Sequence, residues 1–309
     1  MSNNTTVTVV LTTYNGEQFI GEQLSSILEQ TRLPDELVIL DDCSCDRTVD
    51  IISHMIRNVE DLQCRLVINE QNKGWRRNFI DGFHLASGDI IFCADQDDIW
   101  EKNKIELMTD ALKNNANINV LACNLTPLYE AGAKKLAGFY VEKYGNDHIA
   151  PVRLSDRGFT VLRPGCTICF RRSIMNWVDR IWDEKLAHDE VLWAIGLVTD
   201  SLCIINEPLI RFRRHSNNNS PSNEKRIAPR LNRAECDLEK AKKIIDESDE
   251  LNISKENQQF IRDQLSLSVD RVKAFQDRSL WEGLLLIKHI NKYSSIKAWI
   301  ADILCLING

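Results

Sequence analysis

The amino-acid sequence predicts an α/β protein with a mostly parallel sheet whose two faces are covered by helices. In the N-terminal third of the chain, four short apolar segments alternate with segments of helical periodicity. The apolar segments show no alternation with polar residues, which is typical of strands buried on both faces. Each segment ends in polar or acidic residues, and the ligands of such sheets bind beyond the carboxyl ends of the strands.

The predicted strands cover Val7–Leu11, Leu37–Leu40, Leu66–Ile68 and Ile90–Cys93. Apolar residues between them recur at helical spacing and predict three helices, marked by Phe19, Leu24, Ile27 and Leu28, by Val49, Ile52 and Ile56, and by Phe79, Phe83 and Ala86. Strands that alternate with helices in this way form parallel sheets.

Beyond these elements the pattern is less regular. Residues 126–160 look loop-rich, and strand character returns at Cys166–Phe170 and Leu202–Phe212. From about Asn223 onward the chain is helical and charged, with helices marked by Leu231, Leu238, Ala241 and Ile245 and by Phe260, Leu265, Leu267 and Val272. We therefore expect a sheet domain over residues 1–222 and a helical region over residues 223–309.

The bulk properties fit a protein that handles small anions. The 309 residues are 43% hydrophobic, which is sufficient for a sizeable core, and the formal net charge is −7. A general nucleic-acid binder usually has a basic face, so we expect no nucleic acid among the partners. The N-terminus lacks the basic and apolar parts of a secretory signal, and no stretch reaches the roughly 18 apolar residues of a membrane span. We expect a cytoplasmic protein, or one held at the inner face of the cell membrane.

The chain has 10 cysteines, and two close pairs, Cys43-x-Cys45 and Cys166-x-x-Cys169, suggest zinc ligands. A structural zinc ion needs four convergent ligands, usually from two such pairs. Cys166 and Cys169 are expected on one strand, where residues three apart point to opposite faces. We therefore expect reduced core or surface thiols rather than a zinc site.

The sharpest feature is Asp95-Gln96-Asp97-Asp98 at the end of the fourth strand. Three carboxylates within four residues repel one another unless a cation or suitable donors offset their charge. Mg²⁺ and Mn²⁺ take oxygen ligands, usually one or two carboxylates and substrate phosphates. The alternative is a solvated acidic turn that caps a helix starting near Glu101. The tetrad alone leaves both interpretations open.

Two more strand ends carry polar groups. Asp41-Asp42-Cys43-Ser44-Cys45-Asp46 follows the second strand, where an acidic side chain can accept a hydrogen bond from a nucleobase or ribose. Alternatively, Ser44 or Asp46 only caps the next helix. Asn72-Lys73-Gly74-Trp75-Arg76-Arg77-Asn78 follows the third strand and offers cations and amide donors to a phosphate or nucleotide ring. The alternative there is an exposed basic helix start, which the helix macrodipole disfavours.

The order and spacing of these motifs resemble those of family 2 glycosyltransferases. The matching blocks are Val9-Val10-Leu11-Thr12-Thr13-Tyr14-Asn15-Gly16, Asp41-Asp42 with Ser44 and Asp46, Asn72 with Gly74 and Asn78, and Asp95 with Asp97 and Asp98. The form Asp95-Gln96-Asp97-Asp98-Ile99-Trp100 and two later blocks, His188-Asp189-Glu190 and 207–218, are similar to the bacterial rhamnosyltransferase branch. The resemblance covers roughly residues 5–220 and implies a GT-A-type, Rossmann-like fold with a C-terminal helical extension.

The resemblance also implies a role for each matching residue. Asp97 and Asp95 would bind Mn²⁺ or Mg²⁺, with His215 approaching the metal or the diphosphate. The donor nucleotide would contact Thr12, Tyr14, Asp42, Asn72, Arg76, Asp95 and Arg214. Asp189 would be the catalytic base. Cys43 and Cys45 replace the small residues usual between the acidic positions of the family, and we expect no effect on donor binding.

The chemistry of sugar transfer can be argued from the residues as well. A hydroxyl is a poor nucleophile at neutral pH, so a carboxylate must take its proton during attack. Asp189 precedes the apolar helical stretch 191–195 and is either this base or only a helix N-cap. The leaving nucleotide diphosphate gains charge, which a divalent ion with Arg211, Arg213 or Arg214 would offset. Attack from the face opposite the leaving group inverts the reacting carbon in one displacement.

His215 by itself would more often be a surface or structural histidine. Because it lies beside arginines, we expect its imidazole to be neutral and able to ligate a metal or to donate to a phosphate.

The C-terminal stretch 280–307 carries an apolar stripe beside three lysines. The stripe comprises Ile287, Ile290, Trp299, Ile300, Ile303 and Leu304, and the lysines are Lys288, Lys292 and Lys297. It either packs on the sheet domain or on a second copy of the chain, or it lies in an anionic membrane surface. The glutamates and aspartates of the preceding helices favour packing.

The sequence therefore predicts an inverting, metal-dependent glycosyltransferase whose partners are a nucleotide-diphosphate sugar and a saccharide or lipid-linked saccharide acceptor. The rhamnosyltransferase likeness suggests dTDP-β-L-rhamnose as donor and a cell-surface polysaccharide or glycolipid precursor as acceptor. UDP-hexose donors stay open. A nucleotidyltransferase is an alternative, although the first strand is followed by no Gly-rich basic loop, and an inactive sugar-nucleotide-binding protein is another, although Asp97 and Asp189 are both present.

Overall fold

The structure is a computed structural model of the whole chain. It describes residues 5–57, 59, 62–215, 227–293 and 295–308. The expected domain boundary at residues 222 and 223 and the motif residues Ser216, Asn217 and Asn218 lie outside the described residues.

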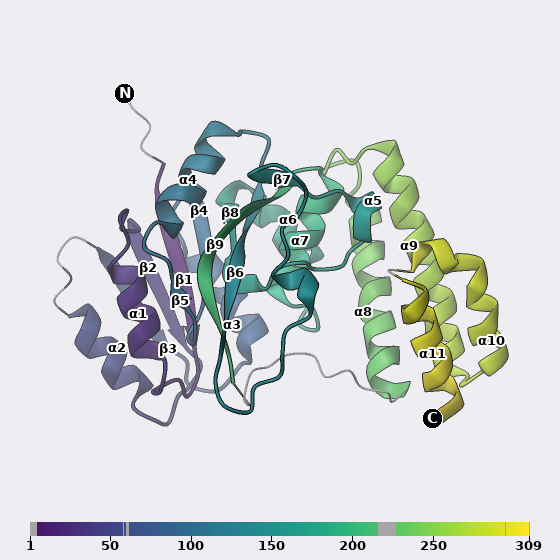
Figure 1. Cartoon of the computed structure of the whole chain (residues 1–309), viewed down its shortest axis with the longest axis horizontal. Helices are drawn as coiled ribbons and strands as arrows, with labels where there is room; N and C mark the ends of the chain where they lie inside the picture. Colours follow the sequence, from purple (N-terminus) through teal and green to yellow (C-terminus); the bar gives the residue numbers. More distant parts are fainter. Residues whose placement is uncertain (1–4, 58, 60–61, 216–226, 294, 309) are drawn as a thin grey trace.

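The centre of the fold is a mixed sheet of nine strands, in which four of the strand pairings of the described residues are parallel and four are antiparallel (Figure 1). The strands are β1 Val7–Thr13, β2 Glu36–Asp41, β3 Gln63–Ile68, β4 Ile90–Asp95, β5 Ile99–Trp100, β6 Val120–Tyr129, β7 Ile149–Pro151, β8 Ile168–Arg171 and β9 Leu202–Arg214. Their order is β3-β2-β1-β4-β8-β6-β9-β5, with β7 also paired to β9. The first four strands are parallel to one another, as predicted, whereas β8 runs antiparallel to β4 and β6.

Helices alternate with the strands and then continue alone. The helices of the sheet region are α1 Ile20–Leu28, α2 Thr48–Ile56, α3 Trp75–Leu85, α4 Lys104–Asn114, α5 Leu154–Arg157, α6 Met175–Ile181 and α7 His188–Val198. Short 3-10 segments lie at Gly138–Tyr140 (η1), Gly165–Thr167 (η2) and Arg172–Ile174 (η3). The C-terminal elements are α8 Ile227–Asp246, α9 Lys255–Gln276, α10 Leu280–Leu285, the 3-10 segment η4 Leu286–Lys292 and α11 Ile296–Asn308.

Two buried hydrophobic clusters, one on each face of the sheet, form the core. Val10, Leu40 and Ile91 belong to the cluster that also contains residues of α3 and α7, here called the α3–α7 face. Their neighbours along the strands belong to the other cluster, which contains residues of α1, α2 and α4. Side chains alternate along a strand. Thr12, two positions after Val10, and Asp42, two positions after Leu40, therefore follow the core residues of the α3–α7 face.

Two sequence-based expectations about the strands were wrong or incomplete. Strand β8 begins at Ile168 and not at Cys166, because Gly165–Thr167 forms a 3-10 turn. Cys166 and Cys169 are therefore not on opposite faces; both are buried in the same cluster. Strand β6 was not predicted from the sequence, because Asn124 and the proline in its second half interrupt the apolar pattern.

The C-terminal helices extend from the sheet region to the end of the molecule opposite α1 and α2 (Figure 1). Cys236, Ala241 and Ile244 of α8 and Ile261 of α9 share the buried cluster of the α3–α7 face. The segment η4 and helix α11 instead pack on α8 and α9 through a separate small cluster. Among the described residues, no helix is both long and apolar enough to cross a membrane.

Gly82 provides a test of how closely α3 packs on the sheet. A Cβ atom at Gly82 would lie 2.5 Å from Val10 Cγ1 and 2.8 Å from Leu40 Cδ1, both buried. We predict that Gly82→Ala lowers the free energy of unfolding by about 1–3 kcal/mol through overpacking. The matched control is Gly21→Ala in α1, where the nearest atom lies 3.9 Å away. It should be neutral or stabilising by up to ~1 kcal/mol. Denaturant titration measures both, and equal effects of the two substitutions would contradict the packing argument.

Candidate active site

Carboxylates from two distant parts of the chain meet at the carboxyl edge of the sheet. Asp95 ends β4 beside Thr12 of β1, and Asp189 is the second residue of α7. Burial and the negative charges of Asp97 and Asp189 together raise the pKa of Asp95 to about 7. The three carboxyl groups therefore lie near enough to interact electrostatically. The site thus gathers negative charge at the place where the sequence predicted a cation.

Asp97 contacts the other predicted metal ligand. Its Oδ2 atom lies 2.8 Å from Nε2 of His215, and the imidazole ring stacks on Phe19 with the ring centroids 5.0 Å apart. A carboxylate, a second carboxylate and an imidazole are all groups that bind Mn²⁺, whereas Mg²⁺ prefers the oxygen ligands. The chemistry of Asp95, Asp97 and His215 suits a divalent cation, but the group whose possible ligand atoms converge within 4.8 Å of one another among the described residues is Asp95, Asp98 and Cys166.

Arg213 holds this loop in place and is not available to a diphosphate. Its Nε donates to the Asp97 carbonyl at 2.8 Å, and its terminal nitrogens reach Glu130 and Glu22. The Arg213 side chain is only 7% exposed. Of the three arginines considered from the sequence, Arg213 is thus structural, and Arg211 pairs with Glu101 at 2.8 Å on the rim.

Asp98, the last carboxylate of the tetrad, points into the protein. It is 1% exposed and accepts a hydrogen bond of 2.9 Å from the Arg213 backbone N–H. Burial raises its pKa well above the usual range, and Cys166 hydrogen-bonds to it. Asp95, Asp98 and Cys166 lie within 4.8 Å of one another. Because burial also raises the pKa of Cys166, its thiol stays protonated and acts as a donor rather than as a ligand for a hard cation.

A buried lysine lies below the acidic cluster. Lys104 is fully buried, donates to the Cys166 carbonyl at 2.7 Å and lies 3.8 Å from the centroid of the Trp100 ring. Its positive charge lowers the pKa of Asp95 and so opposes the effect of burial. No role for Lys104 was predicted, because it follows the polar run Glu101-Lys102-Asn103, which gives no sign that this lysine faces inward.

Asp189, the predicted base, is the second residue of α7. Burial and the charge of Glu190 raise its pKa to about 6, with Arg233 partly opposing the shift. Its Oδ1 accepts only a 2.9 Å hydrogen bond from the next backbone N–H, that of Glu190, among the contacts of the described residues. The N-cap of α7 is Ala187, so the N-cap interpretation of Asp189 was wrong.

His188 anchors this helix start in an aromatic cage. It is 3% exposed and stacks on Phe79 at 3.7 Å between ring centroids, with Trp75 and Phe83 edge-on. Burial lowers its pKa to about 3, so the ring is neutral, and neither ring nitrogen has a hydrogen-bond partner among the described residues. All three aromatic residues come from α3, so His188 links α3 to the residue next to it, Asp189.

The Asp42 carboxylate, which follows β2, holds the loop between β3 and α3 by hydrogen bonds. It is 2% exposed and accepts hydrogen bonds from Asn69 Nδ2 at 2.9 Å and from the backbone N–H groups of Lys73 and Gly74 at 2.8 Å each. Gly74 has φ +85°, a conformation that glycine adopts without strain. Since a carboxylate offers about four acceptor positions, a nucleobase would have to take the remaining one.

Tyr14 is fixed through its main chain and leaves its ring exposed. The Gln96 side chain accepts from the Tyr14 N–H at 2.8 Å and donates to its carbonyl at 3.1 Å. The Tyr14 side chain is 47% exposed, whereas Thr12 is 7% exposed. Gln96, for which no role was predicted, thus links the segment Asp95–Asp98 to the loop after β1.

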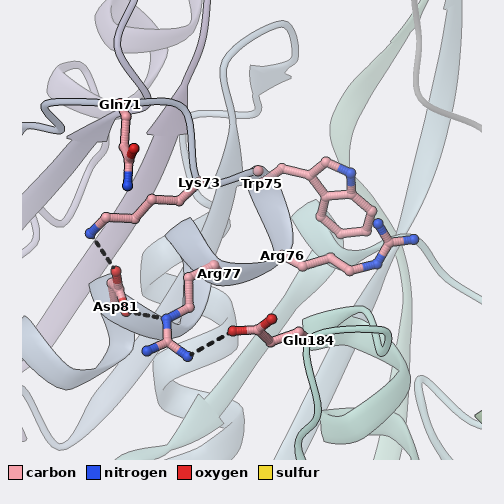
Figure 2. A pocket seen from close by; sticks show the side chains of 8 residues that line it. Gln71, Lys73, Trp75, Arg76, Arg77, Asp81 and Glu184 are labelled. Atoms are coloured by element: carbon pink, nitrogen blue, oxygen red, sulfur yellow. Dashed lines mark hydrogen bonds and ion pairs between the residues drawn. The ribbon is translucent and has the colours of Figure 1, made fainter.

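The remaining predicted donor residues surround the start of α3. A cavity of about 430 Å³ lies here, and Figure 2 shows side chains that line it. Lys73 and Arg77 both pair with Asp81, at 2.9 Å and 3.1 Å. The guanidinium of Arg76 lies 4.4 Å from the Trp75 ring centroid and has no carboxylate partner among the described residues. Arg76 is therefore the cation at this helix start that can face a ligand, while Asn72 accepts from the Gly74 N–H at 3.0 Å.

Arg214 and Tyr140 complete the surroundings of Asp189. Arg214 ends β9 and is 7% exposed. Burial raises the pKa of Tyr140, Asp189 raises it further, and Arg214 opposes the shift, so all three groups lie in one region. Tyr140 was hidden in the segment interpreted as loop-rich, where no periodic pattern indicates which side chains face the site.

A three-layer α/β fold with carboxylates gathered at the carboxyl edge is the arrangement of a GT-A glycosyltransferase. Residues 8–177 match the family described as "Glycosyl transferase family 2". The chain belongs to this family, as its motifs predicted. It is 32% identical over 225 residues to the dTDP-rhamnosyl transferase RfbG of Shigella flexneri, covering 69% of this chain and 74% of that protein. A UDP-Glc:alpha-D-GlcNAc-diphosphoundecaprenol beta-1,3-glucosyltransferase of Escherichia coli is 36% identical over 110 residues, 35% of this chain and 42% of that protein.

Solved structures support the fold. S. aureus TarS, residues 1–349, has a TM-score of 0.64 and 16% identity, with 97% of this chain and 88% of TarS covered. The mannosyltransferase PcManGT of Pyrobaculum calidifontis, solved with GDP-Man and Mn²⁺, has a TM-score of 0.54 and 18% identity, with 99% and 86% covered. The predicted GT-A fold with C-terminal helices is thereby confirmed.

Gly165 provides a test of how Asp189 is positioned. A Cβ atom there would lie 2.4 Å from His188 Nε2 and 3.3 Å from Asp189 Cβ. Because the His188 ring cannot move within its aromatic cage, we predict that Gly165→Ala displaces Asp189 and lowers kcat for nucleotide-sugar turnover roughly 10–100-fold. In a His188→Ala background, which opens space, the same substitution should cost less. An unchanged kcat of Gly165→Ala would contradict the positioning role.

Proposed function

We propose that the protein is an inverting glycosyltransferase that moves L-rhamnose from dTDP-β-L-rhamnose to a hydroxyl of a cell-surface polysaccharide or glycolipid precursor. The observation that carries the proposal is the meeting of Asp189 with the Asp95 and Asp97 carboxylates at one sheet edge. The likeness of this chain to a dTDP-rhamnosyl transferase, over 69% of its length, supports dTDP-β-L-rhamnose as the donor.

Asp189 is the proposed base. Its pKa of about 6 leaves the carboxylate ionised at neutral pH but basic enough to accept the proton of an attacking hydroxyl. The cage around His188 fixes the start of α7, so the carboxylate is held before substrate arrives. Attack guided from this side, opposite a diphosphate bound near Asp97 and His215, inverts the reacting carbon.

The donor nucleotide is proposed to lie along the ends of β1, β2 and β4. Thr12 and the exposed ring of Tyr14 line one side, and the loop held by Asp42 lines the other, with Asn72 and Arg76 at its margin. Asp95, Asp97 and His215 would hold Mn²⁺ or Mg²⁺, and Arg214 adds positive charge near the diphosphate. When bound, the cation would offset the charge that develops on the leaving diphosphate.

The acceptor and the alternative donors are proposed from the names of similar proteins. A lipid-linked saccharide acceptor is supported by the name of the glucosyltransferase relative, which acts on a diphosphoundecaprenol-linked sugar. The name of this relative and the TarS complex with UDP-GlcNAc support UDP-hexoses as the alternative donors.

The first prediction from this proposal concerns the base. Activity at saturating donor should fall as the pH drops through about 6, because Asp189 must be ionised. Asp189→Asn should retain donor affinity but lose transfer at least roughly 10³-fold. Since folding raises the pKa of this acid from 3.8 to about 6, the protein loses stability as the pH rises from about 4 to about 6, and the full cost remains above pH 6. The substitution should therefore raise the free energy of unfolding at pH 7.5, by about 1–2 kcal/mol after allowance for solvent screening.

The control for Asp189→Asn is Glu190→Gln, which neutralises the adjacent carboxylate that pairs with Arg233. It should leave transfer measurable and retain the fall in activity at low pH. Stopped transfer assays across pH and thermal unfolding of each variant provide the readouts. Transfer at the native rate by Asp189→Asn would show that another group is the base.

The second prediction concerns the metal-dependent donor site. Calorimetry should detect binding of dTDP or UDP that strengthens with Mn²⁺, and Asp97→Ala should weaken it roughly 10–100-fold or more. Arg211→Ala is the control, because this side chain is 52% exposed and pairs with Glu101 on the rim. In a hydrolysis screen, one pyrimidine sugar donor should turn over fastest, with dTDP-rhamnose expected. Absence of metal-dependent binding of either nucleotide would exclude the proposed enzyme.

A further inference from the structure

The last two helices present an apolar face to solvent. Among the described residues, fourteen large hydrophobic side chains are exposed, and nine of them lie between residues 280 and 307. They are Leu280, Trp281, Leu284 and Leu285 of α10, Ile287 of η4, and Ile296, Ile300, Leu304 and Ile307 of α11. We call this set the C-terminal apolar face. Such a concentration on one part of the surface marks a binding surface rather than scattered exposure.

Three of the six residues of the expected stripe do not pack within the chain. Ile287, Ile300 and Leu304 are 46%, 43% and 53% exposed, whereas Trp299 packs against the small C-terminal cluster and donates to the Gly283 carbonyl at 3.2 Å. Gly283 and Leu306 meet at the contact between α10 and α11, so the two helices that carry most of the exposed residues pack against each other. The two helices lie together at one end of the molecule (Figure 1).

The inward side of α11 explains why the apolar residues face outward. Asp302 is fully buried and accepts from Arg230 at 2.5 Å, Arg271 at 2.9 Å and the Tyr293 hydroxyl at 2.9 Å. These charge-assisted bonds fix the rotation of α11, because turning the helix would leave a buried carboxylate unpaired. Cys305 and Leu306 are buried on the same side as Asp302, so Ile296, Ile300, Leu304 and Ile307 form a second apolar row on the solvent side of the helix.

Charge and dimensions indicate what covers this face. The segment 280–308 carries Lys288, Lys292 and Lys297 against Glu282 and the buried Asp302, although the whole chain has a net charge of −7. Lys288 and Lys292 pair with aspartates of α9, whereas Lys297 is exposed without a carboxylate partner among the described residues. A two-fold contact centred on Lys297 would bring the Lys297 side chains of two copies toward one another. An anionic surface complements this charge instead.

The exposed tryptophan fits the same partner. Trp281 is 69% exposed, the highest value among the large hydrophobic residues, and tryptophan favours the interface between lipid and water. Helix α11 has 13 residues and is about 20 Å long, too short to cross a hydrocarbon core of ~30 Å. It can lie along a membrane surface with its apolar side inserted.

We propose that the C-terminal apolar face docks the protein on a membrane surface that contains anionic lipids. The inference goes beyond the proposed function, because it depends on this surface and not on the reaction. Its test uses neither donor nor acceptor, so its failure leaves the proposed transfer reaction untouched.

The test is co-sedimentation of the full chain with vesicles. The wild type should pellet with vesicles of phosphatidylcholine and phosphatidylglycerol, and less with phosphatidylcholine alone. Trp281→Ser with Leu284→Ser, and separately Ile300→Ser with Leu304→Ser, should each lower the apparent partition coefficient roughly tenfold or more. Lys297→Glu should weaken binding to the anionic vesicles only. Leu33→Ser, at a side chain 38% exposed outside the C-terminal helices, is the matched control and should bind like the wild type.

Circular dichroism melting checks that each variant is folded, and Trp281→Ser alone replaces a double variant that does not fold. Light scattering after size exclusion reports the oligomeric state in parallel. The proposal is overturned if the wild type stays in the supernatant with both kinds of vesicle, or if Leu33→Ser reduces binding as much as the double variants. It is also overturned if the double variants dissociate a dimer without changing vesicle binding.

Discussion

The confinement of several carboxylates to one partly buried edge of the sheet is the constraint on which the rest of the site depends. Asp95 and Asp97 come from the end of β4, and Asp189 comes from the start of α7. Their mutual repulsion and burial raise the pKa of Asp95 and destabilise the ionised state. The fold tolerates this cost because Arg213 and Lys104 supply fixed positive charge around the cluster. A cation and a diphosphate would bind where that charge balance is incomplete.

The alternation of side chains along the strands decides which polar groups share the site. Thr12 and Asp95 follow core residues of the α3–α7 face, so they end up beside α7 and its Asp189. Asp41 points to the other face, where it accepts a hydrogen bond from Thr13 at 2.9 Å and acts in the structure of the loop. A shift of one residue in register would exchange these roles, because it moves every side chain of a strand to the opposite face.

The helices outside the sheet contribute in two different ways. α3 provides Trp75 and Phe79 for the cage around His188 and, with Arg76, one wall of the cavity in Figure 2. The last helix contributes no residue to this site. There the buried Asp302 fixes the rotation of a helix that is apolar on both its inward and its solvent side. The buried His188 thus positions the proposed base, and the buried Asp302 determines which apolar residues of the last helix face solvent.

The sequence by itself determined the parallel half of the sheet, the family and the acidic strand ends, because these depend on local periodicity and on motifs whose members lie close together in the chain. It did not determine β6 or the 3-10 turn at Gly165, where proline and glycine interrupt the pattern. Only the tertiary structure separated Asp97, which meets His215, from Asp98, which turns inward. Neighbouring residues of one chemical type cannot be distinguished by pattern, since their roles depend on which distant groups the fold brings within a few ångströms. For the same reason the sequence did not show that part of the C-terminal stripe faces solvent. The rotation of α11 depends on the hydrogen bonds of Asp302 to side chains of α8, α9 and Tyr293.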